Sequence, residues 1–364
     1  MPPEIGPRIL LRMRTKIKTE NFGGMLLMEN KGNLLIKYNS QYEAAWDRFI
    51  LSESINGTFL QTRNFLNYHP AQRFQDNSLV YLKGTNIIAV IPANEIIEDG
   101  KKKLISHMGS TFGGIVLGKM YKKIKDVQVL FKDLDDYLKQ NGYSEIILKQ
   151  TSTLFSSEES DLLEYFLFLN NYISSCEIGY YINFDNYDDD IIKNFTSSRR
   201  RDYKYSLKNP FEFKRIESDE DVKQFYLVLE DNMKKFNTVP LHSLEEMLEF
   251  KNHRLKSIVQ FYGVYLEQEL AAGAMIFCFG KQVFHTQYLA AKQEKLGLYP
   301  NEFLYKNLIE IAKQEGFKSL SFGTSTLEHG RVLNQSLAQF KEGFGTMEYV
   351  NRTFTKAIQG GLDC

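Results

Sequence analysis

A lysine near the C-terminal end of the chain stands in a setting that could serve group-transfer chemistry. The stretch Ser321–Ser325 ends a predicted strand, and apolar residues at i, i+4 and i+7 then predict a helix that ends at Phe340 and Lys341. A turn with two glycines, Gly343-Phe344-Gly345, follows directly. From the pattern alone, Lys341 is either a catalytic cation or a charge that complements the dipole at the helix C-terminus.

A second stretch could bind an anionic group such as a phosphate. It joins a predicted strand at Tyr288 to a predicted helix that begins with Pro300. The first backbone N–H groups of a helix and its dipole attract anions. Lys292 and Lys295 add positive charge, and Gly297 permits close approach. Glycine in such a loop is also explained by turn geometry alone.

The first half of the chain has a comparable loop, from Gly109 to Gly114, after a predicted strand that ends at His107. Of the six histidines, His107 is the one whose position beside this loop favours a functional role. His285 lies in the middle of a predicted strand, where a core or cleft position is expected.

A basic helix is predicted around Arg199. It places Arg200, Lys204 and Lys208 on one face, with Arg201 near them. Such a face could bind phosphates or an RNA acceptor stem, and a solvated helix face explains it equally well.

Several kinds of site are not indicated. The histidines show neither an HExxH motif nor paired-ligand spacing, so no metal site is predicted. No GxSxG, Walker A or GxGxxG motif is present, which argues against serine hydrolases, P-loop enzymes and Rossmann dehydrogenases.

Composition restricts the class of protein. The 364 residues include 43% hydrophobic and 25% charged residues, which is typical of a globular chain with two domains. The chain has equal numbers of basic and acidic side chains, 45 each. This balance excludes a positive potential over the whole protein surface, although it allows a local basic patch. Three cysteines favour a reducing compartment. The longest apolar run, Leu270–Phe279, is far shorter than the roughly 20 residues that span a bilayer, so we expect a cytoplasmic protein.

The elements that must position these residues occur in the same order twice. Hydrophobic periodicity predicts β-α-α-β-β-β-α-β from Asn33 to Lys149, with one strand running from Ile87 through Pro92 to Ile97. The second half repeats that order, from the helix at Ser218 to the strand at Ser319–Phe322. A tandem duplication is the simplest organisation.

The predicted boundaries follow from this repeat. Residues 1–28 are interpreted as a disordered extension or a mis-called start. The N-terminal domain is placed at 30–185 and the C-terminal domain at 186–356, with a linker near 185–195 where an acidic run occurs.

At this point the residues resemble a known group, the FemAB-like, acetyltransferase-6-type branch of the GNAT acyltransferases, which is similar to the Fem-type peptidoglycan aminoacyltransferases. The resemblance covers roughly residues 33–356. It depends most on Phe322–Ser325, Asn334 and Phe340–Gly345, and in the first half on Asn56–Phe59, Phe65–His69 and Ser106–Gly114. It implies an α+β fold of two tandem GNAT-like domains, each with a mixed, mostly antiparallel sheet flanked by helices.

The resemblance also implies an activity and a set of site residues. An acyl group would pass from acyl-CoA, such as acetyl-CoA, to an amine on an amino sugar, a sugar nucleotide or another cell-envelope precursor in polysaccharide biosynthesis. In Fem-type enzymes the Phe-Lys pair stabilises the tetrahedral intermediate, which assigns that role to Lys341 beside Phe340, with Tyr288 or Glu302 near enough to help. The donor site would use Lys292, Gly297, Leu298, Asn301, Gly323, Thr324 and Asn334, and the acceptor site His107, Gly109, Phe112, Gly113 and Gly114.

The donor loop departs from the group. The usual pyrophosphate signature is not reproduced, because Gln293 and Gly297 are spaced wrongly and no second glycine follows. Two alternatives therefore stay open: a Fem-like enzyme that uses aminoacyl-tRNA bound by Arg200 and Lys204, or a degenerate, non-catalytic GNAT pair.

Overall fold

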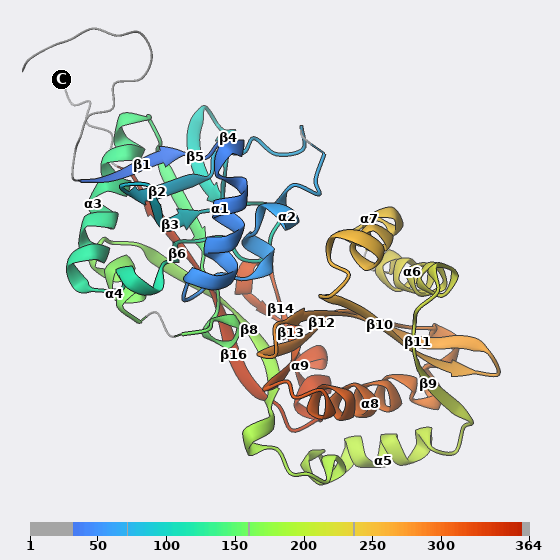
Figure 1. The fold of residues 1–364 in the computed structure, drawn as a ribbon. Helices are drawn as coiled ribbons and strands as arrows, with labels where there is room; N and C mark the ends of the chain where they lie inside the picture. The colour runs from blue at the N-terminus through green and yellow to red at the C-terminus, as the bar shows by residue number, and fades with distance from the viewer. Residues whose placement is uncertain (1–31, 71, 159–160, 236, 359–364) are drawn as a thin grey trace, which may run out of the picture.

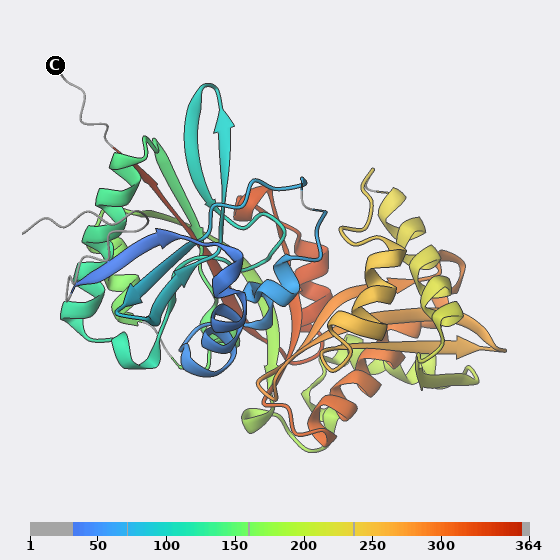
Figure 2. The same cartoon turned by 45° about the horizontal axis from the view of Figure 1, so that its top comes forward.

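The chain forms two lobes that meet along two long strands. The computed structural model describes residues 32–70, 72–158, 161–235 and 237–358, so the predicted extension at residues 1–28 lies outside the described residues. The strands at the junction are β8 (Ile173–Asn183) and β16 (Met347–Ala357), and Figures 1 and 2 show one lobe on either side of them.

Fourteen of the strands described form two sheets. A four-stranded sheet has the order β1-β2-β3-β6, and a ten-stranded sheet has the order β4-β5-β7-β16-β8-β13-β12-β11-β10-β9. The strands of the first half are β1 (Asn33–Lys37), β2 (Leu79–Lys83), β3 (Asn86–Ile91), β4 (Ala93–Glu98), β5 (Lys101–Ser106), β6 (Val116–Leu117) and β7 (Glu145–Lys149). Those of the second are β9 (Phe211–Arg215), β10 (Val259–Leu266), β11 (Glu269–Phe279), β12 (Val283–Ala291) and β13 (Ser319–Thr324), with a small pair β14 (Thr326–Leu327) and β15 (Val332–Leu333).

Helices cover both sheets. The first half has α1 (Glu43–Arg48), α2 (Arg63–Leu66), α3 (Ile124–Gln140) and α4 (Asp161–Leu169). The second has α5 (Ser197–Ser206), α6 (Asp219–Lys234), α7 (Leu244–Glu249), α8 (Pro300–Gln314) and α9 (Gln335–Glu342). The predicted mixed fold of helices and largely antiparallel sheet is confirmed. Short strands and helices such as β9 and α4, and the long β16, were not among the predicted elements.

The predicted strand that continues through Pro92 is wrong. Strand β3 ends at Ile91 in the four-stranded sheet, and β4 begins at Ala93 in the ten-stranded sheet. Proline has no N–H to donate to a sheet ladder, so Pro92 marks the point at which the chain passes from one sheet to the other.

The two halves exchange their last strands. Strand β8 of the first half pairs with β13 of the second, and β16 of the second half pairs with β7 of the first. The exchanged strands also pair with each other, from Met347↔Tyr181 to Thr355↔Ile173. The proposed boundary near residue 185 stays a prediction, because the sheet runs without interruption across the two halves.

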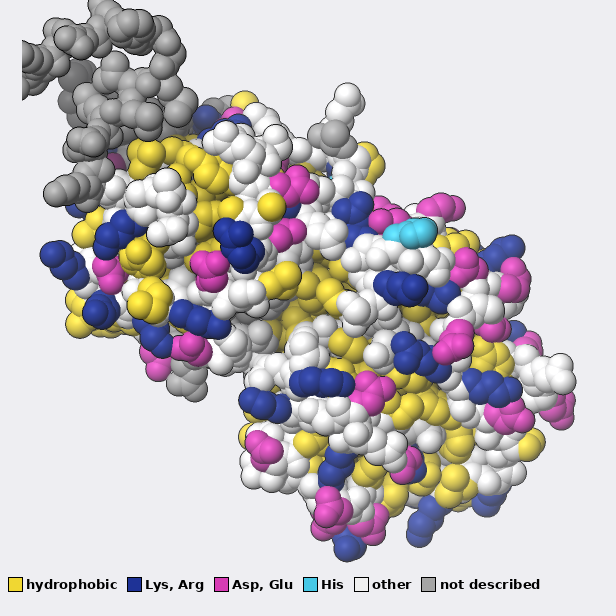
Figure 3. Space-filling view, viewed as in Figure 1, with side chains coloured by type: hydrophobic (Ala, Val, Ile, Leu, Met, Phe, Trp, Pro, Cys, Tyr) yellow, Lys and Arg dark blue, Asp and Glu magenta, His cyan; other side chains and the backbone are white. Residues whose placement is uncertain are grey.

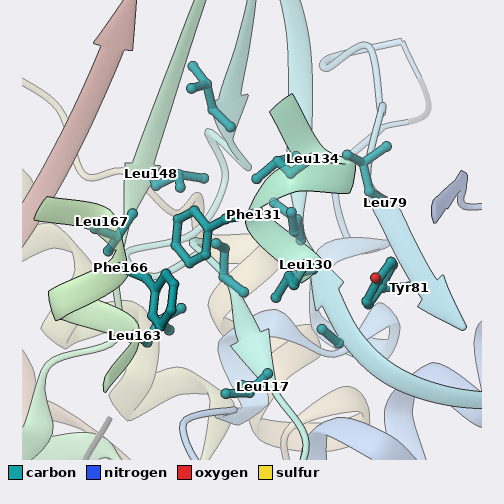
Figure 4. Close-up of a cluster of buried hydrophobic side chains, with 14 of the residues drawn as sticks. Leu79, Tyr81, Leu117, Leu130, Phe131, Leu134, Leu148, Leu163, Phe166 and Leu167 are labelled. Carbon is teal, nitrogen blue, oxygen red and sulfur yellow. The ribbon is translucent and has the colours of Figure 1, made fainter. Parts of the chain in front are cut away.

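The hydrophobic core follows this exchange. Around Phe131 of α3 the first half buries Leu130, Leu134, Phe166 and Leu167 (Figure 4), and Phe354 of β16 belongs to the same cluster. A second cluster joins Phe59 and Phe65 of the first half to Phe225, Phe250 and Phe277 of the second. Residues from both halves therefore share a continuous core.

Candidate active site

Two neighbouring parallel strands of the second half separate and leave a cavity between them. Strands β12 and β13 pair only at Val283↔Ser319, Phe284↔Leu320 and His285↔Ser321. Beyond these pairs lies a cavity of about 270 Å³. Its walls combine the diverging strand ends with side chains of the first half: Leu60, Thr111, Phe112, Phe155, Phe279, His285, Thr286, Gln287, Phe322, Gly323, Thr324, Tyr349 and Asn351.

Both strands are irregular where they separate. The register of β11 and β12 shifts between Met275↔Tyr288 and Ile276↔Thr286, so Gln287 is an extra, bulged residue. On β13 the register with β8 shifts between Ser321 and Gly323. Gly323 has φ +74°, a conformation that glycine adopts without steric cost. These bulges turn Gln287 and Gly323 towards the cavity.

Lys341 lies directly behind this wall. Its Nζ donates to the carbonyl oxygens of Gly323 at 3.0 Å and Thr324 at 2.6 Å. The side chain is 5% exposed, and burial lowers the pKa of Lys341 to about 7. At neutral pH both the charged and the neutral form of Lys341 are therefore populated, although its side chain holds the backbone of the cavity wall. Phe340 points elsewhere, since it packs against Tyr305 and Phe344.

The equivalent gap in the first half is filled. Strands β5 and β7 also pair in parallel at three positions only, from Lys103↔Glu145 to Ile105↔Ile147. Beyond them Ser106 Oγ accepts hydrogen bonds from the N–H groups of Gly114 and Lys149, both at 2.8 Å. The N–H of Gly113 donates to the carbonyl of Lys149 at 2.9 Å. The loop that contains Gly113 and Gly114 therefore closes the gap that stays open in the second half.

A second cavity, of about 370 Å³, adjoins the first between the lobes. The two share Leu60, Thr111 and Gln287. Aromatic and cationic side chains dominate the second cavity, and its lining includes Phe65, Tyr68, His69, Arg73, Phe74, Lys149 and His242. Figure 3 shows hydrophobic side chains in the hollow between the lobes.

Some of the predicted acceptor residues line the two cavities, and others lie behind the residues that line them. Gly109 lines the second cavity and Phe112 the first. His107 is buried behind the loop, where its Nδ1 accepts from the N–H of Gly109 at 3.3 Å. Gly113 and Gly114 close the first-half gap and line neither cavity.

The predicted donor turn is less cationic than its sequence indicates. Lys292 and Lys295 both form ion pairs with Glu269. At the start of α8, the buried carboxylate of Glu302 forms an ion pair with Arg199 of α5. Burial raises the pKa of Glu302, and Arg199 opposes that effect. A carboxylate in the first turn already complements the helix dipole, so little positive field is left there for a pyrophosphate.

Other predicted donor residues lie away from the cavity. Gly297 is exposed and Leu298 accepts a hydrogen bond from Asn209 at 3.4 Å. Asn334 caps α9 by accepting from the N–H of Leu337 at 3.1 Å. Asn301 has a buried Oδ1 that meets no hydrogen-bond donor among the residues described.

Tyr288 does not reach Lys341. Its hydroxyl meets Nδ1 of His242 at 2.9 Å, and both rings belong to the packing beneath the second cavity. Burial raises the pKa of Tyr288 to about 12.

The basic face of α5 lies beside the donor turn. Tyr205 of α5 stacks on Tyr299, which precedes α8, with ring centroids 5.8 Å apart. Arg200, Lys204 and Lys208 are exposed and form no ion pair with any described residue, whereas Arg199 and Arg201 do. None of these exposed cations lines either cavity.

Residues that the sequence analysis did not select complete the site. His285, Ser321, Gln287 and Tyr349 all lie at the point where β12 and β13 separate. Nothing in the sequence marks a bulge at Gln287, and the alternation along β12 alone made His285 a core or cleft residue.

The described part of the chain lacks two other features. It holds no group of three or more His, Cys, Asp or Glu side chains arranged to bind a metal ion. It also has no helix of the length and apolar character needed to cross a bilayer.

Comparison with known proteins identifies the fold. No family model and no curated protein matches the chain. Among solved structures it is similar to FemX, with a TM-score of 0.62 and 13% identity, over 88% of this chain and 96% of FemX. It is also similar to a tandem GNAT protein from the clavulanic acid biosynthesis pathway, with a TM-score of 0.52 and 9% identity, over 91% of this chain and 100% of that one. A third similar structure is L-PGS from Bacillus licheniformis, with a TM-score of 0.50 and 13% identity, over 75% of this chain and 82% of that one. The chain therefore has the FemAB-like tandem GNAT fold that its sequence predicts.

Proposed function

We propose that this chain, which has the tandem GNAT fold of FemX, is an N-acyltransferase whose second half binds an activated acyl donor. The open gap between β12 and β13 is the observation that carries the proposal, because the matching gap between β5 and β7 is closed by the chain's own loop. Of these two gaps between parallel strands, the one in the second half therefore has room for a reacting acyl group.

The acceptor is proposed to bind in the adjoining cavity between the lobes. Tyr68 and Phe74 contribute aromatic rings to its lining, Lys149 contributes positive charge, and Arg73, which forms an ion pair with Glu246, contributes guanidinium N–H donors. Such a lining suits an acceptor that carries both a ring and an anionic group, such as an amino sugar attached to a phosphate. The shared residues Leu60, Thr111 and Gln287 would let the amine reach the donor carbonyl.

For the donor, an aminoacyl ester of tRNA is favoured over acyl-CoA. Glu269 pairs with both lysines of the donor turn and offsets one of their two charges, and Glu302, paired with Arg199, occupies the first turn of α8. Arg200 and Lys204 on the adjacent α5, and Lys208 just beyond its end, form no ion pair with any described residue, and they could bind a nucleic-acid backbone. A cytoplasmic location follows from this proposal, since charged tRNA is made in that compartment.

Lys341 is proposed to stabilise the oxyanion of the tetrahedral intermediate. Its charge stands behind the carbonyls of Gly323 and Thr324 at the cavity wall. Fixed positive charge in a dry site is worth a few kcal/mol to a transition state.

The test compares the two donors directly. Wild-type protein is incubated with glucosamine 6-phosphate, an amino sugar that carries a phosphate, and with tRNA charged with radiolabelled amino acids or with radiolabelled acetyl-CoA, between about 50 and 200 mM salt. We expect amide formation from charged tRNA that falls steeply with salt. Arg200→Glu combined with Lys204→Glu should raise KM for charged tRNA and flatten the salt dependence.

A matched control uses exposed lysines of the first lobe. Lys123→Glu combined with Lys125→Glu makes the same charge change on or next to α3, far from the donor turn, and should leave the kinetics unchanged. Transfer from acetyl-CoA alone, insensitive to the α5 charges, would establish the thioester as donor. Absence of transfer from either donor would point to a non-catalytic binding module.

A further inference from the structure

His285 occupies the last paired position before β12 and β13 separate. It is paired with Ser321 in the parallel ladder, and the next residues on both strands line the cavity. The ring of His285 lies edge-on between Phe155, at 5.6 Å, and Phe279, at 6.0 Å. One phenyl ring comes from the first half and one from the second, so both lobes hold this imidazole in place.

A chain of hydroxyl groups holds one ring nitrogen. Nδ1 of His285 lies 3.0 Å from Ser321 Oγ, and Ser321 Oγ lies 3.3 Å from the hydroxyl of Tyr349. Ser321 Oγ also accepts the N–H of Gly323 at 3.2 Å. With Nδ1 engaged by Ser321, Nε2 is the ring nitrogen left to meet Gln287 or a ligand in the cavity. If Nδ1–H donates to Ser321 and Ser321 donates to Tyr349, Nε2 carries a free lone pair.

We propose that His285 is the general base and acid of the acyl transfer, acting through Nε2, with Ser321 as the residue that positions its ring. The inference rests on the proposed function. The acceptor's neutral amine attacks the donor carbonyl, a C–N bond forms, and the carbonyl electron pair moves to oxygen. Nε2 takes one proton from the nitrogen of this intermediate. When the bond to the leaving group breaks, Nε2 returns that proton to the departing oxygen, or to sulfur in a thioester, so no further reactant is needed.

The electrostatic surroundings favour the neutral imidazole that this role requires. Burial, and secondarily the charge of Lys341 on α9, lower the pKa of His285 to about 4, while a hydrogen bond with Gln287 opposes them. Tyr349 on β16 is linked to His285 through Ser321, and burial raises the pKa of Tyr349 to about 12. The packed faces from β11 and from the segment at Phe155 contribute only phenyl rings. The base is therefore ready at neutral pH.

The pH profile separates this role from a structural one. The rate should rise with pH through the pKa of His285 and fall again as Lys341 loses its proton, because the first group must be neutral and the second charged. In His285→Gln the loss of rate at low pH should become shallower, because only protonation of the acceptor amine is left to cause it, while the high-pH limb stays.

The closing experiment measures amide formation by His285→Gln, His285→Ala and Ser321→Ala. We expect His285→Gln to lower kcat by about a hundredfold or more, with KM changed by less than about threefold. Imidazole added to His285→Ala should restore part of the rate, because the vacated side-chain space opens into the cavity. Ser321→Ala should lower kcat less, by about tenfold. His253→Gln, an exposed histidine outside both cavities, is the matched control and should behave as wild type.

The outcomes are distinguishable. If wild type transfers acyl groups and His285→Gln keeps its kcat within about threefold, the role of His285 is refuted while the proposed function stands. A loss of kcat in His285→Gln together with an unchanged two-limbed pH profile and no rescue of His285→Ala by imidazole would make His285 structural, and would also refute the inference. If wild type forms no amide from either donor, the proposed function fails, and the inference with it.

Discussion

Lys341 supports the wall of the first cavity from behind. Its two hydrogen bonds hold the carbonyls of Gly323 and Thr324, where β13 has separated from β12. Its ammonium is the group that we propose as the stabiliser of the oxyanion. Because burial alone lowers the pKa of Lys341, these bonds do not fully offset the cost of removing the charge from water.

The stability of the protein should therefore depend on pH through Lys341. The pKa is 10.5 in an ordinary lysine and about 7 here, so between these values the unfolded chain binds more protons and stability rises with pH. Relative to Lys341→Met, the free energy of unfolding of wild type should increase by up to about 2–3 kcal/mol from about pH 7 to about pH 9. Urea denaturation at both pH values measures this difference. Parallel pH profiles for wild type and Lys341→Met would contradict it, and Lys125→Met should run parallel to wild type.

Candidate site residues differ in how readily the sequence alone identifies them. Lys341 could be selected because a helix period, a glycine turn and a family resemblance all converge on it. His285 could not, because its place at the cavity depends on its partner across the ladder, Ser321, and on the bulge at Gln287. Strand pairing and bulges are set by distant segments, and a single strand's alternation carries no signal for them.

At the scale of elements, the loop from His107 to Ile115 decides which half keeps an open site. Its conformation depends on Gly114, which has φ +64°. A Cβ at this position would lie 1.6 Å from Gln150 Oε1 and 3.0 Å from its Cα. That oxygen already accepts the N–H of Ile115 at 2.7 Å, so displacing it would also break a buried hydrogen bond.

Gly114→Ala should therefore destabilise the protein much more than the same change at a glycine with a similar backbone conformation in open space. Gly142, after α3, is the matched control, with φ +70° and no atom within 4 Å of the position that a Cβ would take. We expect Gly142→Ala to cost about 1 kcal/mol, from backbone strain alone. Gly114→Ala should cost at least about 2 kcal/mol more, from the clash and the lost hydrogen bond. Urea denaturation compares the two, and equal costs would show that the loop does not pack as tightly as described.

The elements themselves were predicted well where each has a period of its own. One or both faces are buried in helices such as α3 and α8 and in the strands β10 to β12. The spacing of their apolar residues therefore predicts these elements. The division at Pro92 was missed because apolar residues continue on both sides of it, and only the two sheets distinguish β3 from β4.

At the scale of the whole molecule, the sequence predicts the repeated order of elements. It does not predict the exchange of strands between the two halves. In each half two helices are followed by a run of strands, β2 to β6 or β10 to β12, and then by a long helix and one more strand, yet each half completes its sheet with a strand of the other. Which sheet a strand joins depends on contacts between residues far apart in the chain, such as Phe354 with Leu148. Local periodicity contains no information about such pairings.

The exchange predicts that the two lobes unfold together. Phe354 of β16 is 5% exposed and packs in the core of the first lobe, although it lies at the end of the second half of the chain. Phe354→Ala should lower the free energy of unfolding by about 3–4 kcal/mol. It should shift one shared transition, since β16 also pairs with β8, which in turn pairs with β13 in the second lobe.

Two probes can follow the lobes separately in that variant. The fluorescence of Trp46, the single tryptophan and fully buried, reports the first lobe. Hydrogen exchange of β10 to β12 reports the second. Coincident transitions, and a calorimetric enthalpy equal to the van't Hoff enthalpy, are expected for one cooperative unit. Phe168→Ala, which removes an exposed ring, should leave both probes unchanged. If Trp46 responded at a lower temperature while β10 to β12 melted as in wild type, the lobes would be independent, and the active site would then lie between two units free to open without unfolding.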